Sequence, residues 1–109
     1  AYDLAVQTTD ALQRDPEFKQ IVSTKKQIID STKTHGWFGP VNLNNLLWDY
    51  QGAFGVKPGL TDNAGYCLVA AATRNGHTVL AVVLGLPTDR HFFEGAKLLD
   101  YGFKRIGEE

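Results

Sequence analysis

The sequence predicts an α+β fold in which an antiparallel sheet, connected as a meander, is flanked by helices. Residues 66–73 and 77–86 are strongly apolar, and Asn75-Gly76 between them is the strongest short-range signal for a β-hairpin. Near the carboxyl end, apolar residues recur at the intervals typical of a helix that packs one face on a sheet. The residues at this spacing are Phe92, Ala96, Leu99 and Phe103.

The amino-terminal third predicts helices and one short strand. Residues 1–14 have the spacing of an amphipathic helix, which Pro16 ends because the residue before a proline is pushed out of helical geometry. Residues 18–22 continue as one or two further helical turns. Residues 26–32 are rich in β-branched side chains and predict a strand, whereas the glycines and the proline of residues 35–40 predict a turn.

The middle of the chain adds a short helix and the first strand of the meander. Residues 42–50 predict a helix with Asn42 as its amino-terminal cap. Residues 52–61, in which glycine recurs, predict a strand with close backbone approach. We therefore expect this strand to pair with the two apolar segments, and the helix 88–104 to lie on one face of the sheet.

Length, composition and charge exclude several classes of protein. The 109 residues have room for one domain at most, and 43% hydrophobic with 21% charged residues exclude a wholly disordered chain. Eleven basic against twelve acidic residues argue against nucleic acid as a partner, because such binding needs a basic surplus. No apolar run approaches the roughly 20 residues of a membrane-spanning helix.

The histidines and aromatic residues do not indicate a metal or base-stacking site. The three histidines, His35, His77 and His91, lack the paired spacing of metal ligands, so we expect solvated loop and cap side chains, with no metal and no cofactor. Aromatic residues such as Trp37 and Phe38 are expected to pack in the core and at the sheet edge rather than to stack on nucleic-acid bases.

One segment matches a catalytic motif literally. Ser23-Thr24-Lys25-Lys26 fits Ser-x-x-Lys, in which one helical turn brings a lysine nitrogen to a serine hydroxyl. A lysine that acts as a base must be desolvated to lose its proton, yet this pair lies among polar neighbours. We therefore interpret the match as coincidental.

A second segment, Lys57-Pro58-Gly59-Leu60-Thr61, combines a cation with a glycine on a predicted strand. Exposed backbone groups on such a strand can receive an extended peptide by strand addition, and Lys57 would then meet a carboxylate. The alternative is an ordinary edge strand that carries a lysine against aggregation.

Segments spread over nearly the whole chain carry a resemblance to a known family. They include Asn42-x-Asn44-x-Leu46-Leu47, Tyr50-x-Gly52, GVKPGLT at residues 55–61, AGYCLVA at residues 64–70 and LLDYGF at residues 98–103. In this order and spacing they resemble the D-alanyl-D-alanine carboxypeptidases, which are low-molecular-mass penicillin-binding proteins and serine peptidases. The resemblance implies a β-lactamase- or transpeptidase-like fold, with peptidoglycan stem peptides and β-lactams as partners.

In that family three motifs form the site, and this chain matches only the third, Lys-Thr-Gly. The resemblance implies that Lys57 is a catalytic residue that binds the terminal carboxylate of the substrate, and that residues 57–61 form the substrate-binding strand. It also implies that the amide of Leu60 donates to the oxyanion. Pro58 stands where the family has threonine, which removes a hydroxyl and an amide proton.

We accordingly expect residues 1–109 to be one partial domain, the C-terminal part of a transpeptidase-like catalytic domain. The chain alone is expected to be inactive because Ser-x-x-Lys and Ser-x-Asn are absent, and the intact parent is expected outside the cytoplasm, in the cell envelope. An exposed sheet edge could also allow self-association. The alternative from another class is a non-catalytic α+β module that binds a peptide or cell-wall fragment on its exposed strand, and a third is a fragment with no activity.

Overall fold

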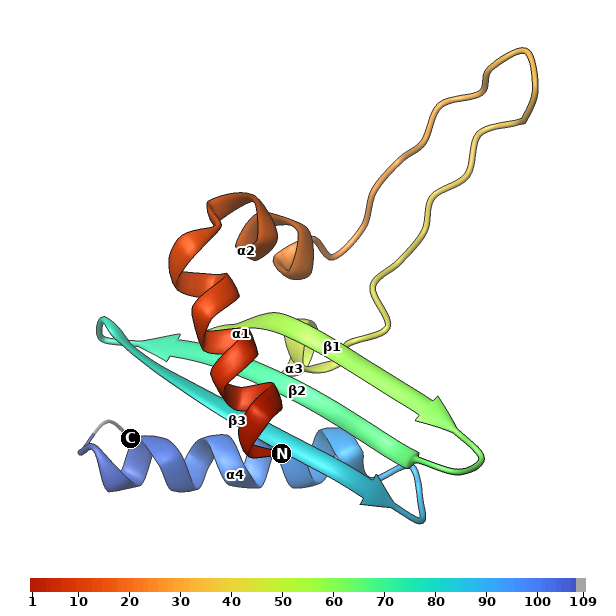
Figure 1. Ribbon diagram of the computed structural model, residues 1–109. Coiled ribbons are helices and arrows are strands. Elements are labelled where there is room, and N and C mark those ends of the chain that lie inside the picture. Colours follow the sequence, from red (N-terminus) through yellow and green to blue (C-terminus); the bar gives the residue numbers. More distant parts are fainter. Residues whose placement is uncertain (108–109) are drawn as a thin grey trace.

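A computed structural model describes residues 1–107 and shows an α+β fold with a single three-stranded sheet (Figure 1). Helices lie on both faces of the sheet, and a long arm extends away from it. The elements, in chain order, are α1 (Tyr2–Arg14), α2 (Pro16–Ser23), α3 (Leu46–Asp49), β1 (Ala53–Thr61), β2 (Gly65–Arg74), β3 (His77–Leu86) and α4 (His91–Arg105).

The sheet is an antiparallel meander in the order β1-β2-β3, as predicted, so β1 and β3 form its two edges. Asn75 and Gly76 connect β2 to β3 with φ angles of 50° and 79°. Glycine and asparagine tolerate these left-handed angles, which match the twist of a hairpin. The predicted fold class is therefore confirmed.

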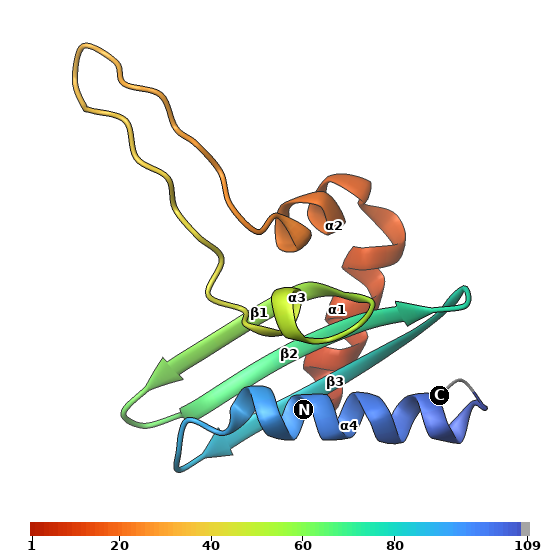
Figure 2. The ribbon, with the colours of Figure 1, turned by 180° about the vertical axis from the view of Figure 1, so that it is seen from behind.

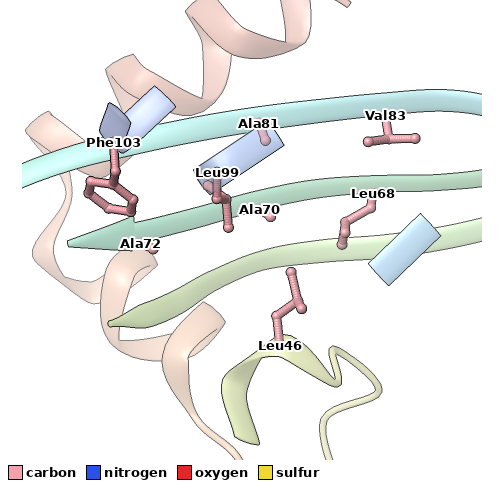
Figure 3. Packing of buried hydrophobic residues seen from close by; sticks show 8 residues of the cluster. All are labelled: Leu46, Leu68, Ala70, Ala72, Ala81, Val83, Leu99 and Phe103. Carbon is pink, nitrogen blue, oxygen red and sulfur yellow. The ribbon is translucent and has the colours of Figure 1, made fainter. Parts of the chain in front are cut away.

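The core lies between one face of the sheet and α4, and Figure 3 shows its packing. The predicted stripe is confirmed at Leu99 and Phe103, which are fully buried, whereas Phe92 and Ala96 lie at its margin. The buried residues of the cluster are Leu46, Leu68, Ala70, Ala72, Ala81, Val83, Leu99 and Phe103.

Helices α1 and α2 cover the opposite face. Thr78 and Leu80 of β3 face Thr9 and Leu12 of α1, since successive side chains on a strand point to opposite faces. Asp15 ends α1 and caps α2, because its carboxylate accepts hydrogen bonds from the Glu17 and Phe18 amides at 3.0 and 3.3 Å. None of the helices in the described part of the chain is long and apolar enough to cross a membrane.

The predictions for residues 26–32 and 35–40 are wrong. Residues 24–45 form a protruding two-limbed arm, joined by bridges at Lys26–Val41 and Ile29–Phe38 (Figures 1 and 2). Its tip is at residues 32–35, and residues 35–40 belong to the returning limb. The β-branched residues pair only with this limb, so no regular strand forms. Trp37 is 68% exposed and Phe38 49%, so their predicted burial is also wrong.

Two helix boundaries also differ from prediction. The expected helix 42–50 is reduced to α3, and Asn42 is not its cap. Instead the side-chain Nδ2 of Asn42 donates to the backbone carbonyl of Thr24 at 3.0 Å. The side-chain Oδ1 of Asn42 accepts a hydrogen bond from the backbone amide of Asn44 at 2.9 Å. These bonds close the base of the arm, which is why Asn42 is unavailable to a helix. The final helix begins at His91 rather than at residue 88.

We expect Tyr50 to make stability fall at high pH. Its hydroxyl donates to Asp100 at 2.7 Å, and burial, followed by this bond, raises the pKa of Tyr50 from 10.0 to about 12. The folded state favours the neutral phenol of Tyr50. The contribution of Tyr50 to the free energy of unfolding is therefore complete below pH 10.0 and is lost as the pH rises through about 12. Urea unfolding across this range should show a steeper loss in the wild type than in Tyr50→Phe. Parallel curves for the two proteins would contradict it.

Candidate functional site

The predicted site residues lie together on the carboxyl-terminal half of β1. Lys57, Gly59, Leu60 and Thr61 are exposed and Pro58 is half-buried. The stretch remains in unbroken antiparallel register with β2, from Lys57 opposite Val69 to Thr61 opposite Gly65. Since β1 is an edge strand, this stretch can be approached from outside the sheet.

Alternation along β1 divides the site between the two faces of the sheet. Pro58 and Leu60 are paired with Leu68 and Tyr66, and Leu68 belongs to the core beneath α4. Lys57, Gly59 and Thr61 therefore belong to the opposite face. A ligand along this edge would meet apolar side chains on one side and the lysine on the other.

Gly59 is a glycine that the fold itself does not require. Apart from its two chain neighbours, a Cβ placed on it would meet no heavy atom of the described residues within 4 Å, and its φ lies outside the left-handed region. By contrast, a Cβ on Gly65 would lie 2.7 Å from the Leu86 carbonyl oxygen. A glycine at an open edge, without such a neighbour, is typical of a place where a ligand approaches the backbone.

The charge of the site comes from Lys57. Its ammonium donates to the carbonyl of Pro58 at 2.6 Å, so it lies along the strand rather than in an ion pair with a carboxylate of the described chain. A lysine ammonium is a compact point charge on a flexible stem, so it can turn to an incoming anion.

A pocket of about 390 Å³ lies beside this stretch of β1. Leu43 of the arm and the first turn of α4 complete its wall. The lining residues are Leu43, Lys57, Pro58, Gly59, Leu60, Tyr66, His91 and Phe92. A hollow of equal size at the base of the arm is lined by Lys25 and Lys26 among others and is separate from the β1 motif.

His91 is a pocket residue that the sequence analysis missed. It was expected to be solvated, yet it is only 9% exposed, with its ring centroid 5.1 Å from that of Tyr66 and 4.1 Å from that of Phe92. Its Nδ1 is buried and has no hydrogen-bond partner among residues 1–107. The sequence did contain a signal for the burial of His91, because it lies four and eight residues before the buried Gly95 and Leu99 and so on the same helix face.

The Ser-x-x-Lys match at Ser23 does not form a catalytic pair. Helix α2 ends at Ser23, whose hydroxyl donates to the Gln20 carbonyl at 3.1 Å, and Lys26 lies beyond it in the arm. The two residues are therefore not one helical turn apart. Within residues 1–107, no group of three His, Cys, Asp or Glu side chains is placed to hold a metal.

The arrangement as described has the features of a peptide-binding site. It combines an open strand edge, one cation and an apolar hollow, the elements that receive an extended anionic peptide. No serine or cysteine is among the described residues that line the pocket.

Comparison with known proteins agrees with the resemblance seen in the sequence. The family model described as D-alanyl-D-alanine carboxypeptidase matches residues 1–88. The D-alanyl-D-alanine carboxypeptidase of Streptomyces sp. strain K15 is 36% identical over 97 residues, which cover 83% of this chain and 33% of the relative. DacF of Bacillus subtilis is 32% identical over 106 residues, covering 96% of this chain and 27% of the relative. The chain thus spans about a third or less of the length of these relatives.

Solved structures give the same result. A variant of the Streptomyces K15 DD-transpeptidase has a TM-score of 0.77 and 37% identity, and the match covers 84% of this chain and 37% of that one. Penicillin-binding protein D2 from Listeria monocytogenes, in its cefotaxime-bound form, has a TM-score of 0.75 and 31% identity, covering 93% of this chain and 39% of that one.

We expect His91→Phe to stabilise the protein. The substitution keeps an aromatic ring between Tyr66 and Phe92 and removes a buried nitrogen that has no partner, which should raise the free energy of unfolding by about 1 kcal/mol. Denaturant unfolding measures it, with His35→Phe on the exposed arm as the control. A loss of stability in His91→Phe would show that the nitrogen makes a native hydrogen bond.

Proposed function

Because the chain belongs to the D-alanyl-D-alanine carboxypeptidase family, we propose that it supplies the substrate-binding strand of a serine-type D-Ala-D-Ala carboxypeptidase. In such an enzyme a serine oxygen attacks the peptide bond between the two D-alanines, and the terminal D-alanine leaves. Water then hydrolyses the acyl-enzyme. The substrate would be a peptidoglycan stem peptide, which ends in a carboxylate.

The observation that carries this proposal is Gly59 at an open edge, directly after Lys57 and Pro58. The space beside its backbone is unfilled although nothing in the fold requires a glycine there. A substrate strand could pair along this edge and bring its terminal carboxylate to Lys57. The edge could thus hold the substrate through main-chain hydrogen bonds while the lysine selects its charged end.

Each residue of the strand has a role in this proposal. Lys57 binds the carboxylate and shapes the electrostatics of the site. The amide of Leu60 donates to the oxyanion, and such a donor contributes roughly 3 kcal/mol of transition-state stabilisation. Pro58 lacks the hydroxyl and amide proton of the family's threonine, which weakens carboxylate recognition but is tolerable on an edge strand.

The nucleophile would come from outside this chain. We place residues 1–109 in the C-terminal part of a catalytic domain whose Ser-x-x-Lys and Ser-x-Asn motifs lie upstream. The share of the relatives that the chain covers, 33% and 27%, supports only that the domain is partial. A serine at the site is essential, because without it nothing can be acylated.

The partners and location follow from the same proposal. The Listeria protein D2 is described in cefotaxime-bound and ampicillin-bound forms, which supports β-lactams as ligands of the complete enzyme. An enzyme that acts on peptidoglycan works outside the cytoplasm, in the cell envelope. Self-association through an exposed sheet edge stays a prediction, and a monomeric mass in light scattering at high concentration would count against it.

We expect the chain by itself to form no covalent adduct with penicillin. The test is mass spectrometry after incubation with a labelled penicillin. A second protein joins this chain to the unmatched part of the Streptomyces relative, and this chimera should form a stoichiometric adduct. An adduct on Ser23 of the isolated chain would contradict our interpretation of that motif. A folded but unreactive chimera would favour the non-catalytic binding module.

Two substitutions in the same chimera test the roles of the strand residues. Lys57→Ala should slow acylation at least ten-fold because it removes the charge that meets the carboxylate. Pro58→Thr should leave the rate unchanged or raise it, since it restores a hydroxyl and an amide proton. Equal rates for Lys57→Ala and the parent chimera would remove Lys57 from the site.

A further inference from the structure

Pro58 leaves the candidate carboxylate site short of hydrogen-bond donors. It stands where the family has threonine, so this position of the strand has neither a hydroxyl nor an amide proton. A carboxylate has two oxygens with about four acceptor positions, and a bound carboxylate needs donors that replace its water. Lys57 supplies one flexible ammonium, which donates to the Pro58 carbonyl at 2.6 Å. The site therefore has room for a further donor.

The imidazole of His91 lies on the same side of the sheet as Pro58. Pro58 is paired with Leu68, which belongs to the core beneath α4, and His91 is the first residue of α4. Both residues line the hollow beside β1, and Lys57 approaches the same hollow from the other face. None of the described lining residues is an Asp or a Glu that would compete for these donors. A carboxylate that enters the hollow can therefore meet both the lysine and the imidazole.

The buried ring of His91 has an unused nitrogen. The residue is only 9% exposed, yet Nδ1 has no hydrogen-bond partner among residues 1–107. Such a nitrogen has a free-energy cost, and each unsatisfied buried group in a native structure calls for an explanation, of which a role in the site is one.

The packing of the ring allows it to present a donor to a ligand. The contacts with Tyr66 and Phe92 restrict the plane of the ring. A half-turn about the bond between Cβ and Cγ keeps this plane and exchanges the sides on which the nitrogens lie. No hydrogen bond of Nδ1 within the described chain opposes the turn. Because a neutral imidazole carries a hydrogen on one of its nitrogens, an N–H is available without a change of charge.

We propose that His91 is a carboxylate-binding residue whose N–H takes the place of the donors that Pro58 lacks. The proposal rests on the proposed function, because that function brings the carboxylate of a terminal D-alanine to Lys57. It gives the first turn of α4 a role in recognition as well as in packing. The histidine then matters most while residue 58 is a proline, and less once a threonine restores the donors.

The test is a double-mutant cycle with N-acetyl-D-alanine, which has the carboxylate and the methyl group of a terminal D-alanine. It is titrated into the ¹⁵N-labelled full chain, and the amide shifts of Lys57, Gly59 and Leu60 give the dissociation constant. We expect His91→Phe to weaken binding at least ten-fold in the wild type and less than three-fold in Pro58→Thr. His35→Phe, the same exchange on the exposed arm, should leave the constant unchanged.

Unfolding measurements on the same variants separate a binding role from a structural one. His91→Phe keeps the aromatic ring and removes the nitrogen without a partner, so it should gain stability while it loses affinity. A loss of both would overturn the proposal, because it would show that the fold itself uses the nitrogen.

The part of the domain outside this chain could instead hold the partner of Nδ1, and the chimera described above tests this alternative. We expect His91→Phe to slow acylation of the chimera by penicillin at least five-fold. An unchanged rate, with a loss of affinity only in the isolated chain, would overturn the proposal.

The remaining outcomes distinguish this proposal from the proposed function. Equal losses from His91→Phe with proline and with threonine at position 58 would overturn the compensation. If Lys57→Ala weakens binding and His91→Phe does not, His91 is not part of the site and the carboxylate site of the proposed function stands. If the wild type does not bind N-acetyl-D-alanine, the present proposal fails, and acylation of the chimera decides the proposed function.

Discussion

The close packing of α4 against the sheet is the constraint on which the rest of the structure depends. A Cβ on Gly95 would lie 2.7 Å from Cδ2 of Leu68, so the helix can come this near only because a glycine is there. Gly102 makes the same kind of approach to Val79 about two turns later. The facing strands carry small side chains beneath the helix, which lets its backbone lie close to the sheet. These are Ala70, Ala72 and Ala81. Small residues on both sides therefore determine how far α4 stands from the sheet.

The position of α4 in turn determines the pocket. Its first turn lies against Tyr66, and His91 and Phe92 form one wall beside β1. The opposite wall comes from the arm, whose base is closed by the Asn42 hydrogen bonds. Three distant parts of the chain thus meet at one stretch of the edge strand. The site is therefore formed by residues far apart in the sequence and not by one local motif.

Local patterns in the sequence predicted much of this arrangement, and long-range contacts account for what they missed. The meander could be predicted because Asn75-Gly76 specifies a tight turn between two apolar runs. The arm could not be predicted, because residues 26–32 have the composition of a strand. They form only isolated bridges with the other limb, since no sheet lies beside them. Lys57 and Gly59 could be predicted as site residues because they stand in the Lys-x-Gly order of the family motif. The helical spacing of His91 to Leu99 indicated its burial, but its place in this pocket could not be predicted, since that depends on contact with Tyr66, 25 positions earlier by their residue numbers.

The central claim is that residues 57–61 keep an open edge for a ligand, and Gly59→Ala tests it most directly. The structure leaves room for the added methyl group, so the free energy of unfolding should stay within about 0.5 kcal/mol of the wild type. The same methyl group would project from the face that carries Lys57, so it should crowd a carboxylate bound there and weaken the binding of N-acetyl-D-alanine at least ten-fold. Unchanged binding, or a large loss of stability with binding retained, would show that Gly59 serves the fold rather than a ligand.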